Sequence, residues 1–461
     1  MTRSLVSFQE NKAEPFYRWL KYKEAFSSKL VKYFLAHFDT PAKYPLRVLD
    51  PFAGTGTTLT TSASKGHHAT GIELLPVGVS AIRARLAADT VDINEFQKYL
   101  DKLKNFPLEP SHSEYSFPHL RITEKAFPPH TERELSAYRF FLDQIENEQV
   151  RYLFWFACLS ILEEISFTNK DGQYLRWDHR SGRVLRSKYQ KKTIREFREA
   201  VHEKLGIMLE DIKNRNGGSF STRVKIVAGS CLTELVNFSD NSIDLIITSP
   251  PYCNRYDYTR SYALELAFLG FSEEDVKQLR QTLLSATVEN RTKREHLAAT
   301  YARQNRESAF DWVVDGFNFQ EALQEVLSLL YAARENGKLN NNNIPQMVAS
   351  YFFEMNFVVH EMARILSPGG RVYMVNDNVQ YVGEEIPVDL ILSDLAEHAG
   401  LRVDHIWILP RGKGNSSQQM GNFGRKELRK CVYVWSKPAN TRLKPAKGAK
   451  ISTSPRFSLP N

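Results

Sequence analysis

The chain has 461 residues, too many for a single domain of roughly 150 residues, and its 42% hydrophobic and 25% charged content excludes a disordered chain or a collagen-like repeat. The 61 lysines and arginines exceed the 53 aspartates and glutamates, and the net charge of +8 permits a nucleic-acid partner without requiring one. No apolar run reaches the ~18 residues that span a bilayer, and no secretory signal is seen, so a cytoplasmic protein without a membrane partner is expected.

The first predicted elements form a strand–helix–strand unit. After an aromatic and basic N-terminal segment, apolar residues at helical spacing predict a helix over 26–38, with Ser27 or Ser28 as its cap. Residues 47–50 then predict a short strand, 58–65 a helix, and 68–73 a second strand that ends in an acid. A glycine turn joins the first strand to the helix, as in a βαβ unit.

The later elements are strands separated by helical blocks. Strands are predicted at 224–227, 243–247, 371–375, 405–409 and 431–435. The apolar run at 243–247 is typical of a strand that is buried on both faces. Residues 108–220 contain a buried-type helix at 152–165 and a basic helix with Ile194, Phe197, Val201 and Leu205 on one face. Residues 256–345 contain a helix start at Ser272 and Asp275 and a helix lined by Phe319, Leu323, Val326, Leu327 and Leu330.

The turn after the first strand is a candidate nucleotide site. It consists of Asp50, Pro51, Phe52, Ala53, Gly54, Thr55, Gly56 and Thr57. Glycines at a strand-to-helix turn let a ligand approach the backbone, and Glu73 at the end of the next strand suits the two hydroxyls of a ribose. A P-loop is disfavoured because no Gly-Lys-Ser/Thr follows; a dinucleotide site stays open, although Leu59 replaces the third glycine. A simple tight turn is the alternative.

The sharpest signal is Ser249-Pro250-Pro251-Tyr252, directly after the buried strand. Two prolines stiffen the turn and present carbonyls rather than N–H groups. A carbonyl and the Ser249 oxygen are two acceptors that can hold the hydrogens of a planar exocyclic amine, and Tyr252 offers a flat face for a base. The alternative is a stiffened strand exit with a buried tyrosine.

These motifs resemble the class I amino-methyltransferases that use S-adenosylmethionine on DNA bases. The turn at 50–58 is similar to their cofactor motif and Ser249–Tyr252 to their catalytic motif, and residues 15–31 and 367–372 also resemble segments of that family. The resemblance covers about half of the chain, at 1–107, 221–255 and 346–436. It implies an α/β fold, a Rossmann-like class I methyltransferase sheet with helical insertions, and Ser-Pro-Pro-Tyr is commonest in its cytosine-N4 enzymes.

The resemblance also implies site residues and a division of the chain. Cofactor contacts are expected from Tyr22, Lys23, Phe26, Ser27, the turn residues 50–57, Glu73 and Ser230, with Asp50 at the amino-acid end of S-adenosylmethionine. Ser230 stands where the family often has an acid. The predicted parts are a cofactor-binding part at 1–107, a helical insertion at 108–220, a catalytic strand and motif at 221–255, a second helical block at 256–345, a C-terminal sheet part at 346–436 and a disordered basic tail at 437–461.

The expected reaction is methylation of a flipped base in double-stranded DNA, with a companion restriction endonuclease as a possible partner. The two helical blocks are candidates for target recognition, and candidate DNA contacts are Lys170, Gln173, Arg176, Arg411, Lys413 and Arg425, together with Arg180, Arg183, Lys426, Arg429 and Lys430. Charged solvent-facing turns are the alternative. The rivals in function are an adenine-N6 DNA enzyme, an RNA-base enzyme and a non-catalytic nucleic-acid-binding module.

No carbon-5 cytosine chemistry is expected, because that reaction needs a cysteine nucleophile, usually after proline. Cys158, Cys231, Cys253 and Cys431 do not follow proline. They also form no Cys-x-x-Cys pair, so no metal site is predicted, and their scatter indicates a reducing compartment.

Overall fold

A computed structural model describes residues 2–38, 45–108, 115–171, 174–185, 188–215, 218–410 and 427–439. Its centre is a seven-stranded sheet in the order β10-β11-β7-β6-β1-β2-β5. These strands are β1 (Arg47–Asp50), β2 (His68–Glu73), β5 (Val224–Ala228), β6 (Ile243–Thr248), β7 (Leu366–Asp377), β10 (Arg402–Ile408) and β11 (Lys430–Ser436). Neighbouring strands pair in parallel except β11, which is antiparallel to both β7 and β10.

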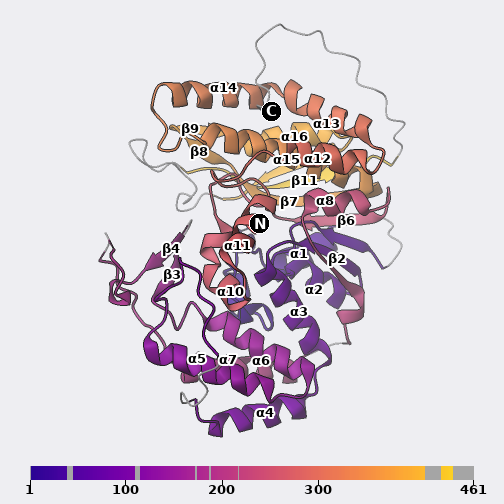
Figure 1. Ribbon diagram of the computed structural model, residues 1–461. Helices are drawn as coiled ribbons and strands as arrows, with labels where there is room; N and C mark the ends of the chain where they lie inside the picture. Colours follow the sequence, from indigo (N-terminus) through magenta and orange to yellow (C-terminus); the bar gives the residue numbers. More distant parts are fainter. Residues whose placement is uncertain are drawn as a thin grey trace.

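Helices cover both faces of this sheet (Figure 1). One face packs on α1 (Ser28–Ala36) and α2 (Thr57–Ser64), through side chains such as Leu245 and Ile247 of β6. The other face packs on α8 (Cys231–Glu234), α15 (Ile344–Ile365) and α16 (Val388–His398), through alternate residues such as Ile246. Residues on both faces of β6 are therefore buried, which confirms the prediction for 243–247. The fold is the Rossmann-like α/β sheet that the motifs imply.

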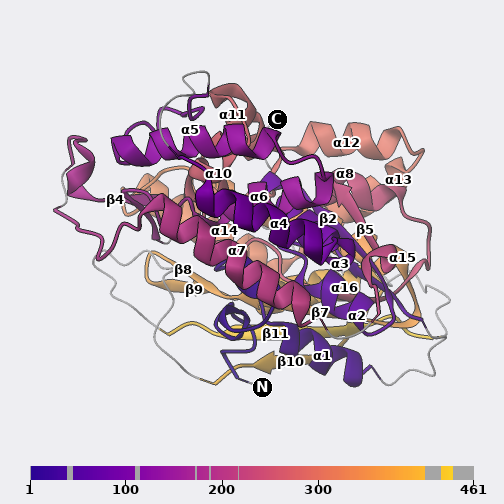
Figure 2. The same cartoon turned by 90° about the horizontal axis from the view of Figure 1, so that it is seen from below.

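A separate helical core lies on the side of the molecule seen at the bottom of Figure 1 and in front in Figure 2. It consists of α3 (Pro76–Thr90), α4 (Ile93–Asn105), α5 (Pro129–Asp143), α6 (Glu148–Ile161), α7 (Phe197–Lys213), α9 (Tyr258–Ser261), α10 (Ala263–Phe268) and α11 (Glu273–Thr282). At the top of Figure 1, α12 (Arg294–Ala302), α13 (Glu307–Phe319) and α14 (Glu321–Glu335) pack around α15. Two hairpins complete the description: β3 (Thr168–Asp171) with β4 (Tyr174–Trp177), and β8 (Val379–Tyr381) with β9 (Glu384–Ile386).

Several predictions of elements need correction. The helix expected at 152–165 ends at Ile161, and α7 begins at Phe197, so Ile194 precedes the helix rather than lining it. Phe319 ends α13 instead of lining α14. The β3–β4 hairpin was not predicted, because its polar sequence lacks the apolar alternation of a half-buried strand.

Other local signals were read correctly. Ser27 caps α1 by accepting from the backbone N–H of Leu30 at 3.2 Å, and Ser272 and Asp275 form the capping box of α11. Among the described residues, no helix combines the length and apolar character that crossing a membrane requires.

Candidate functional site

A cavity of about 470 Å³ lies at the edge of the sheet where the parallel strands end. Its walls include most of the predicted site residues: Tyr22, Lys23, Phe26, Asp50, Pro51, Phe52, Ala53, Gly54, Thr55, Thr57, Glu73, Ser230, Ser249, Pro250, Pro251 and Tyr252. The segments after β1, β2, β5 and β6 meet here because the carboxyl ends of parallel strands share one edge of a sheet. The predicted cofactor turn and the diproline motif therefore line the same cavity.

The two glycines of the turn, Gly54 and Gly56, occupy different positions relative to the cavity. Gly54 (φ 52°) lies in the cavity wall, and an added Cβ would meet the Tyr22 ring at 3.3 Å. Gly56 (φ 77°) caps α2, and its Cβ would lie 2.6 Å from Cγ1 of Ile82. Gly56 is not among the lining residues, so it shapes the turn from behind.

Glu73 is held by the turn itself. Its Oε2 accepts from the backbone N–H of Gly54 at 2.5 Å, and its Oε1 accepts from that of Leu75 at 2.6 Å. Burial, reinforced by the nearby Asp50, raises the pKa of this carboxyl to about 8. Each carboxyl oxygen keeps capacity for a further hydrogen bond, as a ribose hydroxyl would require.

Asp50 links the two motifs. Its carboxylate accepts from Oγ1 of Thr58 at 2.8 Å and from Oγ1 of Thr248 at 2.7 Å, and Phe52 adds a backbone N–H at 3.1 Å. Burial raises its pKa to about 6. Both oxygens are thus already engaged within the protein, and Asp50 joins the cofactor turn to the residue before Ser249.

The N-terminal segment forms another wall. Tyr22, Lys23 and Phe26 line the cavity, whereas Ser27 does not. The prediction of Ser27 as a cofactor contact is corrected, because its hydroxyl caps α1 and donates to the carbonyl of Leu5. The Tyr22 ring stacks on Tyr262 with centroids 5.2 Å apart.

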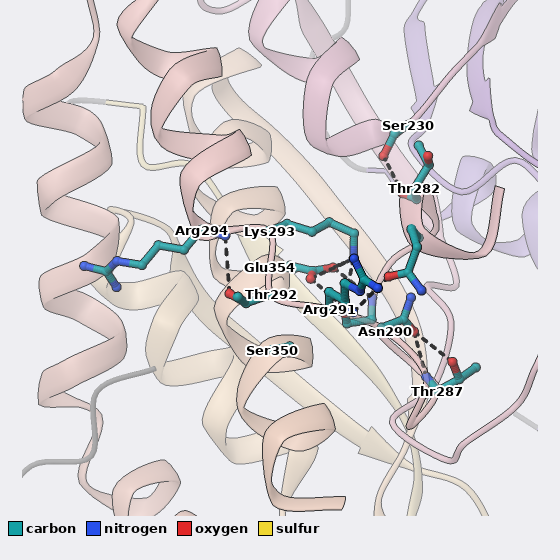
Figure 3. Close-up of polar contacts among 12 residues, drawn as sticks. Ser230, Thr282, Thr287, Asn290, Arg291, Thr292, Lys293, Arg294, Ser350 and Glu354 are labelled. Atoms are coloured by element: carbon teal, nitrogen blue, oxygen red, sulfur yellow. Dashed lines mark hydrogen bonds and ion pairs between the residues drawn. The ribbon is translucent and has the colours of Figure 1, made fainter. Parts of the chain in front are cut away.

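Figure 3 shows how the wall near Ser230 is fixed from behind. Ser230 donates to the carbonyl of Thr282 at 3.5 Å, and the following residues Leu283 and Leu284 line the cavity. Beyond them, the Lys293 ammonium lies 2.9 and 3.1 Å from the two carboxylate oxygens of Glu354 on α15. Ser285 donates its N–H and its hydroxyl to the same carboxylate. This buried cluster fastens the 282–293 segment to the central helix.

Two further residues lie in the cavity beside the diproline corner, Ser249–Tyr252: Asp377, which the sequence did not single out, and Lys430, which was predicted as a DNA contact. Asp377 at the end of β7 and Lys430 at the start of β11 both line the cavity and pair across the strands at 2.9 Å. Burial opposes the charge of Lys430, but the electrostatic influence of Tyr252 and Asp377 outweighs it and raises the pKa of the ammonium above its usual value. For Asp377 the only local signal was the polar run after Val375. Its position opposite Lys430 depends on the pairing of β7 with β11, which are far apart in the sequence.

The proposed DNA contacts fare unevenly. Lys170 is 4% exposed and pairs with Glu265 at 2.5 Å, with its ammonium over the Tyr262 ring, so the prediction that it contacts DNA is corrected. Lys430, another predicted DNA contact, lines the cavity, and Arg429 pairs with Asp389 at 3.1 Å. The Arg176 guanidinium stacks over the Tyr189 ring. Gln173, Arg411, Lys413, Arg425 and Lys426 lie outside the described residues.

The described cysteines are all free and buried. Burial raises the pKa of the Cys253 thiol far above its usual value, the opposite of what a nucleophile needs. No three His, Cys, Asp or Glu side chains of the described ranges gather as they would around a metal ion.

Comparison with known proteins identifies the family. No protein-family model matches the chain. The chain is 46% identical over 446 residues to the type II methyltransferase M.AvaI of Nostoc sp. (strain PCC 7120) and to that of Anabaena variabilis, an alignment covering 95% of this chain and 90% of each relative. It is 40% identical over 456 residues to the type II methyltransferase M.BsoBI of Geobacillus stearothermophilus, covering 95% and 88% of the two chains. The cavity that joins a nucleotide turn to a diproline corner thus belongs to a member of the type II methyltransferases, DNA methyltransferases that use S-adenosylmethionine as methyl donor.

Proposed function

We propose that the protein methylates the exocyclic amine of a DNA base within a specific duplex sequence. The amine proposed is N4 of cytosine, and N6 of adenine is the alternative. One observation carries the proposal: the cofactor turn and Ser249–Tyr252 line one cavity. A donor held by the turn and an amine held at the diproline corner would then be neighbours, and proximity of this kind replaces a covalent intermediate.

The cavity fits the cofactor. Its volume of about 470 Å³ suits a nucleoside-sized ligand, and the Glu73 carboxyl in its wall is poised to accept from ribose hydroxyls. Leu283 and Leu284 supply an apolar wall near Ser230. When bound, S-adenosylmethionine supplies an electrophilic methyl group on a sulfonium centre.

The protein's own task is to present the amine. An exocyclic amine is a poor nucleophile because its lone pair is delocalised into the ring. The Ser249 hydroxyl oxygen and the Pro250 carbonyl would accept its two hydrogens, which favours the pyramidal nitrogen that can attack. The Tyr252 ring would stack on the base, which has to leave the duplex to enter a cavity of this kind.

The choice of atom and base rests on two features. The raised pKa of buried Cys253 disfavours attack at cytosine carbon 5, which needs a thiolate. The serine of Ser-Pro-Pro-Tyr favours cytosine N4 over adenine N6, because the adenine enzymes of the family mostly carry aspartate there.

The test is the chemical identity of the product. Genomic and plasmid DNA from cells expressing the protein would be digested to nucleosides and analysed by mass, beside cells expressing the Tyr252→Ala variant. N4-methylcytosine present only with the active protein supports the proposal. N6-methyladenine would move the assignment to adenine, and 5-methylcytosine or unmodified DNA would overturn the proposed chemistry.

We further infer a companion restriction endonuclease that cuts the sequence methylated here. Plasmid modified by the protein should resist one endonuclease specificity and remain sensitive to others. Resistance to none of a broad panel would contradict this inference.

A further inference from the structure

Four polar side chains, those of Asp377, Lys430, Tyr252 and Ser249, form a line beside the diproline corner. Oδ1 of Asp377 lies 2.9 Å from the Lys430 ammonium, which lies 3.4 Å from the Tyr252 hydroxyl, and that hydroxyl lies 3.3 Å from Oγ of Ser249. The residues come from the ends of β6, β7 and β11. The ion pair has an ordinary length, whereas the two contacts of the Tyr252 hydroxyl are long for hydrogen bonds.

The chemistry of the four groups determines which of them donate and which accept hydrogen bonds. An ammonium carries only donors, so the oxygen of Tyr252 accepts from Lys430, while Asp377 forms an ion pair with the same ammonium. Burial raises the pKa of Tyr252, so the phenol stays neutral and keeps an oxygen that can accept. The geometry of the contact makes Ser249 the donor to this oxygen.

We propose that Lys430 and Asp377 are positioning residues that turn the Ser249 proton toward Tyr252, so that the lone pairs of Ser249 face the target amine. The inference deepens the proposed function and rests on it. Ser249 and Tyr252 touch the base, whereas Lys430 and Asp377 act through them.

Orientation matters because a serine hydroxyl can both donate and accept. A freely rotating Ser249 would spend part of its time donating to the target base, and a proton donated to the amine nitrogen occupies the lone pair that has to attack. With its single proton committed to Tyr252, Ser249 can only accept from the amine. Fixed dipoles of this kind avoid reorganisation during the reaction.

The experiment measures single-turnover methyl transfer in the full-length protein with saturating S-adenosylmethionine and DNA. Tyr252→Phe keeps the ring and removes only the relaying oxygen, and Lys430→Met removes the ammonium. Each should slow methyl transfer by about 10- to 100-fold, the range expected for one oriented hydrogen bond. Affinity for S-adenosylhomocysteine and KM for DNA should stay within about twofold of the parent values.

A double-mutant cycle separates orientation from structural damage. If Lys430 acts through the Tyr252 and Ser249 hydroxyls, Lys430→Met should cost little further rate in a Tyr252→Phe or a Ser249→Ala background. Lys430→Arg, which keeps a donor, should restore part of the rate. A Tyr252→Phe variant with the parent rate, or a Lys430→Met loss of equal size in the Ser249→Ala background, would overturn the proposal.

Failure of this inference and failure of the proposed function look different. A product that is not a methylated exocyclic amine defeats the proposed function whatever the variants do. A methylated amine with additive effects in the cycle leaves the proposed function standing and removes only the role of Lys430. Thermal unfolding of each variant identifies loss of fold. If Lys430→Met unfolds, the rate of Tyr252→Phe, which deletes a single oxygen, decides the test.

Discussion

Glu73 should make cofactor binding sensitive to pH. Because burial raises its pKa to about 8, the free protein holds this carboxyl protonated at neutral pH. Ribose hydroxyls donate more strongly to a carboxylate, so binding would lower the pKa and release a proton. Affinity for S-adenosylhomocysteine should therefore rise with pH, by at most about tenfold per unit, and level off above about pH 8. Calorimetry across this range, in buffers of different ionisation enthalpy, measures both the affinity and the proton released.

The matched control is Glu73→Gln, which cannot titrate. It should bind more weakly and show a flat pH response over the same range. An equally steep response in the glutamine variant would mean that another group titrates.

Single residues also show what the sequence could and could not predict. The acid at the end of β2 and the diproline turn after β6 were recognisable because their meaning lies in adjacent residues. Lys170 and Lys430 are the opposite case: their partners Glu265 and Tyr252 lie 95 and 178 positions away along the chain. Both lysines looked like surface charges, and only the fold reveals one as a buried structural ion pair and the other as part of the cavity.

At the scale of elements, the buried Lys293–Glu354 pair should matter for stability and for the cofactor. Lys293→Met leaves the Glu354 carboxylate without its cation, and breaking a buried pair in this way costs about 3–5 kcal/mol. Since the pair fastens the segment that carries Leu283 and Leu284, affinity for S-adenosylhomocysteine should fall as well. Denaturant unfolding and calorimetry test the two effects.

Lys277→Met is a suitable control, because Lys277 pairs with Glu274 on the surface of α11 with both side chains more than half exposed. Exposed pairs contribute about 0–1 kcal/mol, so this variant should resemble the parent protein. Equal losses in the two variants would contradict the role assigned to Lys293.

A second element, the segment that follows β4, is built to project from the surface. The Asp178 carboxylate accepts from the Arg180 guanidinium at 2.6 Å and from the Lys191 N–H at 2.7 Å, and the Lys191 ammonium donates to the carbonyls of Ser166 and Thr168. Beyond this anchor Val184 is fully exposed. The base of the hairpin adjoins the cavity, since Lys23 of the cavity wall donates to the carbonyl of Lys170.

We expect this segment to touch DNA. Val184→Asp should weaken duplex binding, because the added negative charge would face phosphates, while Leu329→Asp at an exposed site on α14 should not. Fluorescence anisotropy with a labelled duplex compares the two variants at one salt concentration. Unchanged affinity for Val184→Asp would exclude the segment from the interface.

The elements themselves were predictable to different degrees. β1 and β2 were predicted with their observed bounds, because β1 enters a glycine turn and β2 ends in an acid, and both features are local signals. Ile194, which precedes α7, and Phe319, which ends α13, were assigned to α7 and α14 because apolar spacing continued across a helix boundary. The β3–β4 hairpin escaped because its burial comes from tertiary contacts such as that of Lys170 with Glu265.

For the whole molecule, the net charge of +8 and a duplex substrate together predict salt-sensitive binding. Each phosphate contact contributes about −0.9 to the slope of log affinity against log salt. Duplex affinity should therefore fall steeply between about 50 and 200 mM salt, whereas affinity for S-adenosylhomocysteine should change little. A flat response of duplex binding would contradict a phosphate-contacting interface.

The order of strands could not have been predicted from the local patterns. The sequence indicates which segments form the central sheet, but β11, the last strand of that sheet in chain order, lies between β7 and β10 rather than at an edge. That placement brings Lys430 opposite Asp377 and into the cavity.

The position of β11 has a consequence during synthesis on the ribosome. A nascent chain that already contains the glycine turn and the diproline corner still lacks the strand between β7 and β10. That strand, β11, emerges after the other six strands of the sheet. The sheet closes, and the ammonium of Lys430 reaches Tyr252, only when translation has passed Ser436. Chains that terminate before β11 would therefore leave DNA unmethylated.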